Sequence, residues 1–190
     1  MSAEKFGAAI QEAILSLPQD CKAVLRIVED PDLDDTQRTD AAGALLHVLS
    51  GSNVIPGMKG ILAYVDDVLV MRVVLERLSK ASPEAFSAHH EEFPEVYQPM
   101  TEQLQVAREH LGDLMKVIEH AAARVSTLNF KGHTAIDCSK DTEGSTWLYD
   151  SLQEALVDQF DFDDEEVARE LKELRKIMPA LEQRAANLKA

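Results

Sequence analysis

Two adjacent aspartates, Asp66 and Asp67, lie within the most apolar helix that the sequence predicts, residues 61–75. On a helix, Asp66 shares a face with Leu69 and Asp67 shares one with Val70, so at least one carboxylate is expected to be partly buried. A buried carboxylate needs hydrogen-bond donors or a cation beside it, because an uncompensated buried charge is strongly unfavourable. The pair therefore marks the position where a polar site is expected.

The irregular connection before this helix offers suitable donors. Residues 51–57 contain turn-forming residues and no helical pattern, so their backbone N–H groups need acceptors. We expect an aspartate of the pair to accept hydrogen bonds from these amides, and Asn53 to add a local side-chain bond. Asp66, Asp67 and Asn53 are thus predicted to form a structural clamp that holds the turn between two helices.

A metal site is the alternative interpretation of the same residues. His47, one helix earlier, can approach Asp66 and Asp67, and one imidazole with two carboxylates can hold a divalent cation. The alternative function is then a metal-dependent, hydrolase-like enzyme centred on these three residues. Under the clamp interpretation we expect no metal, no cofactor and no catalytic residue.

Other polar patterns in the chain match no established site. Asp30, Asp32 and Asp34 alternate as at the start of a calcium-binding loop. However, the sixth position of that loop is Asp35 instead of glycine, and the twelfth is Ala41 instead of glutamate. The sequence also has no phosphate-binding loop, dinucleotide fingerprint, nucleophile elbow or zinc-finger spacing.

The charge balance restricts the partners. The 190 residues include 34 acidic and 19 basic ones, which gives a net charge of −15. Such a surface repels nucleic-acid phosphates, so no nucleic-acid partner is expected. Cys21 and Cys138 are far apart and fit a reduced, cytoplasmic protein. Neither a signal peptide nor an apolar run of about 18 residues is present, so no integral membrane segment is predicted.

The hydrophobic spacing predicts an all-α fold in a single domain, residues 1–190, as a compact bundle of about seven to eight helices. The first helix is expected over 3–17 and to end at Pro18, with a short helix following from Asp20. Asp34 and Asp35 are expected to cap a helix that runs to Ser50. The next helix is expected over about 58–80.

The second half of the chain contains a long non-helical segment between helical ones. Residues 129–145 are predicted to be non-helical and are either functional, ordered by their own side chains, or flexible. A C-terminal helical pair is predicted over 146–187, with Pro179 kinking or interrupting its second helix.

The clearest periodicity covers residues 95–128, where a heptad pattern predicts one helix of about 30 residues. The proposed interaction face of this helix consists of Tyr97, Met100, Leu104, Leu111, Leu114 and Ile118. The seam is expected either to pack inside an antiparallel bundle or to pair with a second copy as a coiled coil. We favour the bundle, because the alanine and methionine positions of the seam suit close packing within one chain.

Residues 29–78 resemble the YkvA-like family of bacterial helical domains of unknown function. The matching residues are Asp30-Pro31-Asp32, Gly43-Ala44-Leu45, Leu49-Ser50, Val54-Ile55-Pro56 and, over 61–67, Ile-Leu-Ala-Tyr-Val-Asp-Asp. The resemblance implies a helical hairpin core over 29–80 and supplies no reaction. Asn53 and Gly57 stand where the family usually has aspartates, and Ala63 replaces a usual glycine, so two of four acidic positions are lacking.

Together these features favour a non-enzymatic helical interaction or scaffold protein that binds a protein partner or a second copy of itself. The metal-dependent enzyme and a membrane-associated regulatory module are the alternatives. Asp66 and Asp67 oppose the membrane alternative, since two carboxylates at a bilayer centre cost about 5 to 7 kcal/mol.

Overall fold

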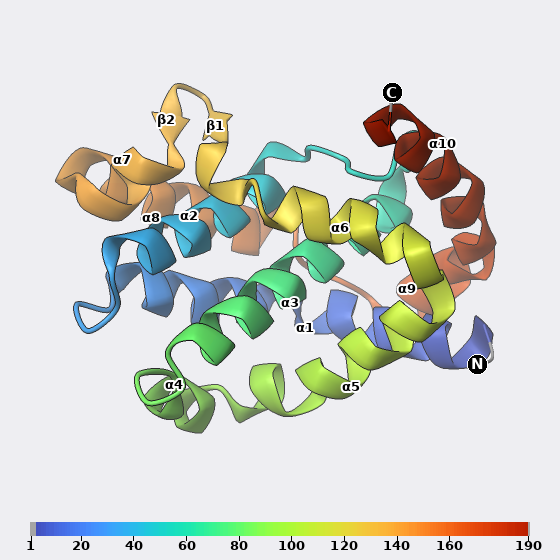
Figure 1. Cartoon of the computed structure of the whole chain (residues 1–190), viewed down its shortest axis with the longest axis horizontal. Coiled ribbons are helices and arrows are strands. Elements are labelled where there is room, and N and C mark those ends of the chain that lie inside the picture. Colours follow the sequence, from blue (N-terminus) through green and yellow to red (C-terminus); the bar gives the residue numbers. More distant parts are fainter. Residues whose placement is uncertain (1–2, 190) are drawn as a thin grey trace.

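The fold is almost entirely helical (Figure 1) in this computed structural model, which describes residues 3–189. Ten α-helices occur in that range, and seven of them span eight residues or more. They are α1 (Ala3–Glu29), α2 (Asp35–Ser50), α3 (Tyr64–Ala81), α4 (Phe86–Glu92), α5 (Pro94–Leu111), α6 (Met115–Ala122), α7 (Ala135–Lys140), α8 (Thr142–Asp158), α9 (Asp164–Glu170) and α10 (Ile177–Lys189). Short 3₁₀ helices lie at Gly60–Ala63, Gly112–Leu114, Val125–Thr127 and Leu171–Lys176. The all-α prediction is confirmed.

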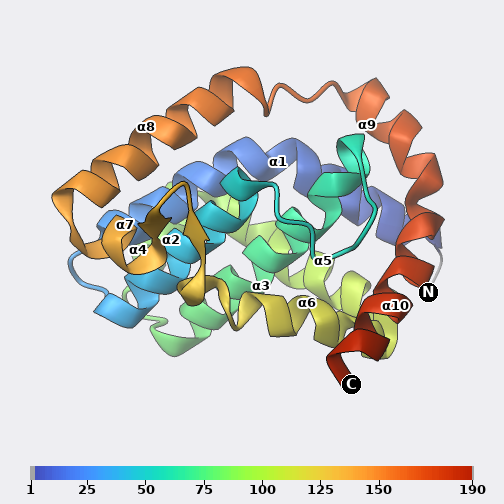
Figure 2. The ribbon, with the colours of Figure 1, turned by 90° about the horizontal axis from the view of Figure 1, so that it is seen from above.

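Helices α1, α2 and α3 form the centre of the bundle. Helix α2 packs against both α1 and α3, and α3 also packs against α5 and α6. Figure 2 shows α8 running along one side of this core, with α9 and α10 at the end where the chain terminates. Nearly every side chain of α3 between Val65 and Leu75 is buried, as expected for a helix that is apolar on all sides.

Helix α1 is the longest helix of the fold, with 27 residues, and it continues through Pro18. The prediction that Pro18 ends the first helix is therefore wrong. Proline removes one backbone hydrogen bond from a helix interior, at a cost of about 3 kcal/mol. The apolar stripe of α1, buried on both sides of Pro18 from Phe6 to Val28, outweighs that cost through its packing.

The helix predicted over 95–128 is divided at Gly112. Helix α5 ends at Leu111 because Gly112 adopts φ 55° and ψ −129°, a conformation that is not helical and that favours glycine. A 3₁₀ turn and then α6 continue the chain in a new direction (Figure 1). The heptad pattern concealed this break, because apolar residues recur at the same spacing on either side of the glycine.

The segment 129–145 contains more structure than expected. Strands β1 (Asn129–Phe130) and β2 (His133–Thr134) form a small antiparallel hairpin whose tip residues, Lys131 and Gly132, both have positive φ. Thr134 then caps α7 with a reciprocal bond to Asp137. Helix α8 follows directly, so most of this segment is helical, contrary to the prediction.

The C-terminal half of the predicted pair is interrupted before Pro179. The 3₁₀ helix Leu171–Lys176 separates α9 from α10, and Pro179 lies in the first turn of α10. That position tolerates proline because the first N–H groups of a helix have no partner within the helix. The last predicted helix is interrupted, as expected, but the interruption lies at Leu171–Lys176, upstream of Pro179.

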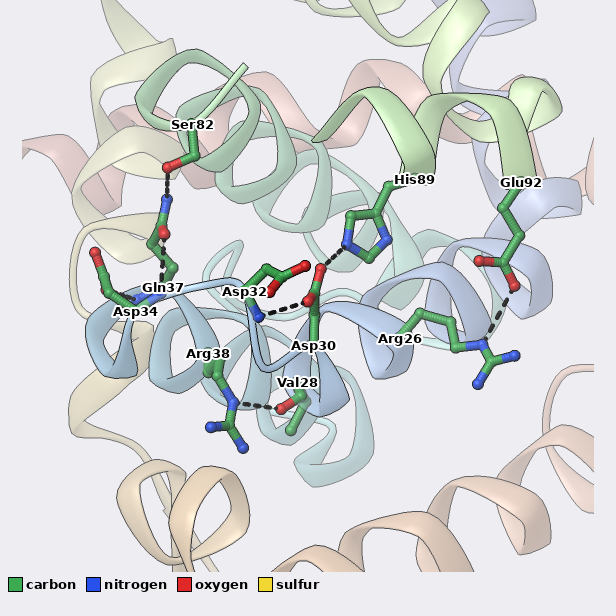
Figure 3. Close-up of polar contacts among 10 residues, drawn as sticks. All are labelled: Arg26, Val28, Asp30, Asp32, Asp34, Gln37, Arg38, Ser82, His89 and Glu92. Carbon is green, nitrogen blue, oxygen red and sulfur yellow. Dashed lines mark hydrogen bonds and ion pairs between the residues drawn. The ribbon is translucent and has the colours of Figure 1, made fainter. Parts of the chain in front are cut away.

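The acidic turn between α1 and α2 is held by neighbouring helices (Figure 3). Asp34 caps α2 as predicted, and its side chain accepts the Gln37 N–H at 2.8 Å. Asp30 lies 2.7 Å from Nε2 of His89 in α4, and its other oxygen accepts the Asp32 N–H. Asp30 therefore stabilises the turn, and Asp34 caps the N-terminus of α2.

None of the helices in the described part of the chain is long and apolar enough to cross a membrane.

Candidate metal centre

The aspartate pair and His47 lie on two central helices, α3 and α2, which residues 51–63 connect. His47 lies in the last turn of α2, and Asp66 and Asp67 lie in the first turn of α3. The helix dipoles favour these positions, since a helix C-terminus stabilises an imidazolium and a helix N-terminus stabilises carboxylates. The chain reversal between α2 and α3 therefore brings the three groups together.

The three side chains meet at short distances in the interior. His47 Nε2 lies 3.4 Å from Asp66 Oδ2 and 3.3 Å from Asp67 Oδ1. One ligand atom from each residue lies within 4.8 Å of the other two, and no other group of three potential metal ligands forms among the described residues. All three residues are buried, with at most 5% of any of these side chains exposed.

The backbone of the connecting turn contacts this group directly. The Val54 N–H donates to Asp66 Oδ2 at 2.8 Å, which is a bond of the kind that the sequence predicted for an aspartate of the pair. This hydrogen bond fixes the orientation of the Asp66 carboxylate and gives the Val54 N–H of the turn an acceptor. Asn53, in contrast, is exposed at the edge of the turn, and the structure assigns its side chain no hydrogen bond to a described residue.

Two polar atoms at the centre have no hydrogen-bond partner among the described residues. They are Nε2 of His47 and Oδ1 of Asp66. Unpaired buried polar atoms are rare in folded proteins, because each loses its hydration without compensation. Burial and, next, the Asp66 carboxylate raise the pKa of Asp67 well above its usual range. The interior thus holds one imidazole and two carboxyl groups at short distances, with two polar atoms that no hydrogen bond from a described residue satisfies.

Two cavities are lined in part by residues of the centre. Asp67 lines a cavity of about 640 Å³ with Tyr64, Phe162 and Glu170 among its walls. His47 lines a second cavity of about 410 Å³ that includes His120 and Arg124. Asn53 lines both cavities. A small ion or water can thus approach the buried centre without displacing a helix.

The proposed interaction face on the long helix is part of the core. Leu104 and Ile118 are fully buried, Tyr97, Met100 and Leu111 are at most 5% exposed, and Leu114 is half-buried. These side chains pack inside the chain, as the bundle alternative requires, because α5 and α6 bend around α3. The seam is therefore corrected from an interaction face to a core element.

A second buried polar group was not foreseen from the sequence. Arg72 of α3 is 1% exposed, and its Nη2 lies 3.1 Å from Oδ2 of the fully buried Asp20. The same guanidinium donates to Ser16 Oγ at 2.7 Å. The available signal was a single arginine within an otherwise aliphatic helix, which needs an internal acceptor.

In comparisons with known proteins, no protein-family profile, curated protein or solved structure matches the chain.

Proposed function

We propose that this protein is a non-enzymatic helical protein that binds a divalent cation through His47, Asp66 and Asp67. The cation joins the C-terminus of α2 to the N-terminus of α3 and thereby fixes the turn at residues 51–57. The observation that carries the proposal is the meeting of one imidazole and two carboxylates in the interior with His47 Nε2 and Asp66 Oδ1 unpaired.

The spacing of the ligand atoms supports a shared cation. Ligands about 2.1 Å from a metal ion are about 3.0 to 3.4 Å from one another in octahedral or tetrahedral geometry. The distances from His47 Nε2 to the two carboxylates, 3.3 and 3.4 Å, agree with that spacing. The Val54 N–H bond to Asp66 orients the carboxylate, as hydrogen bonds to metal ligands commonly do.

The donor set indicates which cations to test. Imidazole nitrogen suits zinc and other transition metals, and carboxylate oxygen suits manganese, magnesium and calcium. A set with one imidazole and two carboxylates therefore favours Mn²⁺ or Zn²⁺ over Ca²⁺, which prefers six to eight oxygen ligands.

Thermal melting with and without cation tests the proposal. The protein is first freed of metal with EDTA, and melting temperatures are then recorded with added Mn²⁺, Zn²⁺, Mg²⁺ or Ca²⁺. We expect the melting temperature to rise with Mn²⁺ or Zn²⁺, because a ligand that binds only the folded state stabilises it. His47→Gln and Asp66→Asn should each abolish that rise.

The matched control is His120→Gln. His120 is exposed and lines the same cavity as His47, but it does not belong to the group of three ligands. This variant should retain the full cation-dependent rise. If no cation raises the wild-type melting temperature, or if His120→Gln loses the rise as well, the proposal is overturned.

A metal-dependent hydrolase is the second candidate function, and the cavity of about 640 Å³ beside Asp67 is the observation that favours it. A cation held by three protein ligands retains positions for water or substrate. Hydrolysis of p-nitrophenyl acetate that depends on Mn²⁺ or Zn²⁺ and disappears in Asp67→Asn would support this candidate over a purely structural cation.

Membership of the YkvA-like family, suggested by residues 29–78, stays a prediction. A cytoplasmic location and the binding of a protein partner stay predictions as well.

A further inference from the structure

A shallow groove lies between the β1–β2 hairpin and the first half of α8, away from the candidate metal centre. The groove has a volume of about 620 Å³ and is lined by His133, Thr142, Glu143, Thr146, Trp147 and Asp150. Both views place the hairpin and α7 at the end of the molecule opposite α9 and α10 (Figures 1 and 2). None of the residues that line this groove lines either of the two cavities beside the candidate metal centre.

An aromatic stack forms one wall of the groove. The ring of His133 lies parallel to the indole of Trp147, with centroids 4.1 Å apart and planes 10° from parallel. Phe130 of the hairpin packs beside the same indole at 6.2 Å. Trp147 is half-buried, so these rings hold it in place and leave part of the indole at the groove. A fixed indole is the best aromatic platform for a cation.

Two carboxylates flank the indole on its own helix. Glu143 and Asp150 are four residues before and three residues after Trp147, so all three share one face of α8, with the acids about 10 Å apart along the axis. Both acids are exposed, and no described residue forms a hydrogen bond or ion pair with either of them. The groove lining contains no lysine or arginine. The neighbouring Lys131 lies instead over Phe130, 5.2 Å from its ring centroid.

We propose that this groove, defined by His133, Glu143, Trp147 and Asp150, binds a basic peptide segment of a protein partner. The charge of the surface selects this occupant: unpaired carboxylates beside an indole attract a guanidinium or ammonium group, and the net charge of −15 draws basic segments toward the whole protein. An arginine side chain lies against the indole and donates hydrogen bonds to Glu143 or Asp150.

The sole tryptophan of the chain provides the measurement. Trp147 is the only tryptophan, so its fluorescence reports on the groove alone. The wild-type protein is titrated with the blocked peptide Gly-Arg-Gly-Arg-Gly, and the uncharged peptide Gly-Gln-Gly-Gln-Gly serves as the reference ligand. We expect a saturable change in fluorescence with the arginine peptide only, and weaker binding at higher salt because the attraction is screened.

Two double variants separate the groove from general surface charge. Glu143→Gln with Asp150→Asn retains Trp147 and should raise the Kd by about tenfold, as expected for the loss of two charge-assisted contacts. Glu165→Gln with Glu182→Gln removes the same charge from exposed positions in α9 and α10 and should change the Kd by less than about twofold. Circular dichroism confirms that each variant is folded.

The results that overturn the proposal are equally definite. Wild-type fluorescence that does not saturate with the arginine peptide contradicts a binding site. Equal weakening in the two double variants shows that the peptide is attracted by overall charge instead of by the groove. An equal response to the glutamine peptide shows that no cation is recognised.

Discussion

Nε2 of His47 lies 3.3 Å from Oδ1 of Asp67, although the two residues are twenty positions apart and lie on different helices. The contact exists because α2 and α3 pack side by side after the chain reverses through residues 51–63. It joins the C-terminal end of one central helix to the N-terminal end of the next. Any change that separates these two helix ends is expected to open the candidate centre and to release the turn.

The Val54–Asp66 hydrogen bond should contribute to folding. Asp66→Asn retains a side-chain oxygen that can accept the Val54 N–H, whereas Asp66→Ala removes the acceptor. We expect Asp66→Ala to have a free energy of unfolding about 1 to 3 kcal/mol lower than Asp66→Asn, because the amide is left unpaired. Urea denaturation in EDTA measures both variants without cation. Equal stability of the two variants would show that the bond does not hold the turn.

The Asp20–Arg72 pair should make folding depend on pH. Burial raises the pKa of Asp20 to about 6, against the opposing effect of Arg72. The folded protein therefore holds this proton more tightly than the unfolded chain, in which aspartates titrate near pH 4. The contribution of Asp20 to stability is largest below about pH 4 and is lost as the pH rises to about 6.

Asp20→Asn removes this titration. The difference in unfolding free energy between wild type and Asp20→Asn should decrease by about 2 kcal/mol from pH 4 to pH 6. Denaturation in urea at several pH values gives this difference, and the exposed Asp158→Asn is the control that should leave the pH profile unchanged. A constant or increasing difference over this range would contradict a raised pKa for Asp20.

Gly43 should not tolerate a side chain. A Cβ atom at Gly43 would lie 2.2 Å from the backbone oxygen of Val125, because α2 and the 3₁₀ helix Val125–Thr127 approach closely there. We expect Gly43→Ala to lower the free energy of unfolding by about 2 to 4 kcal/mol through overpacking. Thermal and urea denaturation measure the loss.

Gly7→Ala is the matched control for Gly43→Ala. Gly7 also lies in a helix, but its added Cβ would meet only Leu174 at 4.0 Å, an ordinary contact. Alanine has the higher helix propensity, so this variant should be stabilised by up to about 1 kcal/mol. Similar effects at the two glycines would mean that α2 and the 125–127 segment are not in contact.

The buried heptad seam should affect stability and leave the molar mass unchanged. Leu104 is fully buried within the chain, so Leu104→Ala should lower the free energy of unfolding by about 2 to 5 kcal/mol. The exposed neighbour Gln105 provides the control, and Gln105→Ala should be nearly neutral. Light scattering at two concentrations should give the same mass for all three proteins. A lower mass for Leu104→Ala would restore the coiled-coil interpretation.

A hydrogen bond could be predicted from the sequence where its donor and its acceptor are close neighbours along the chain. Asp34 was expected to cap α2, and it does, because the N–H groups of a first helical turn always need an acceptor. The all-α class followed from hydrophobic spacing at 3.6 residues per turn, which is a property of the chain alone.

Predictions failed where packing overrode local preference. Pro18 was expected to end a helix, but the apolar stripe of α1 continues on both sides of it and is buried throughout. The heptad pattern continues through Gly112 because an isolated glycine does not disturb it, yet the positive φ of Gly112 ends α5 and turns the chain. The hairpin at 129–134 was missed because two-residue strands carry almost no periodic signal.

By itself the sequence determined that two carboxylates lie in an apolar helix and therefore require partners, because an isolated buried charge is unfavourable whatever the fold. Only the tertiary structure decided what those partners are. The packing of α2 against α3 places His47 between Asp66 and Asp67 and leaves Nε2 and Oδ1 unpaired, whereas Asn53 faces outward. Such distances depend on how the chain reverses between the two helices, and spacing along the sequence does not encode that reversal.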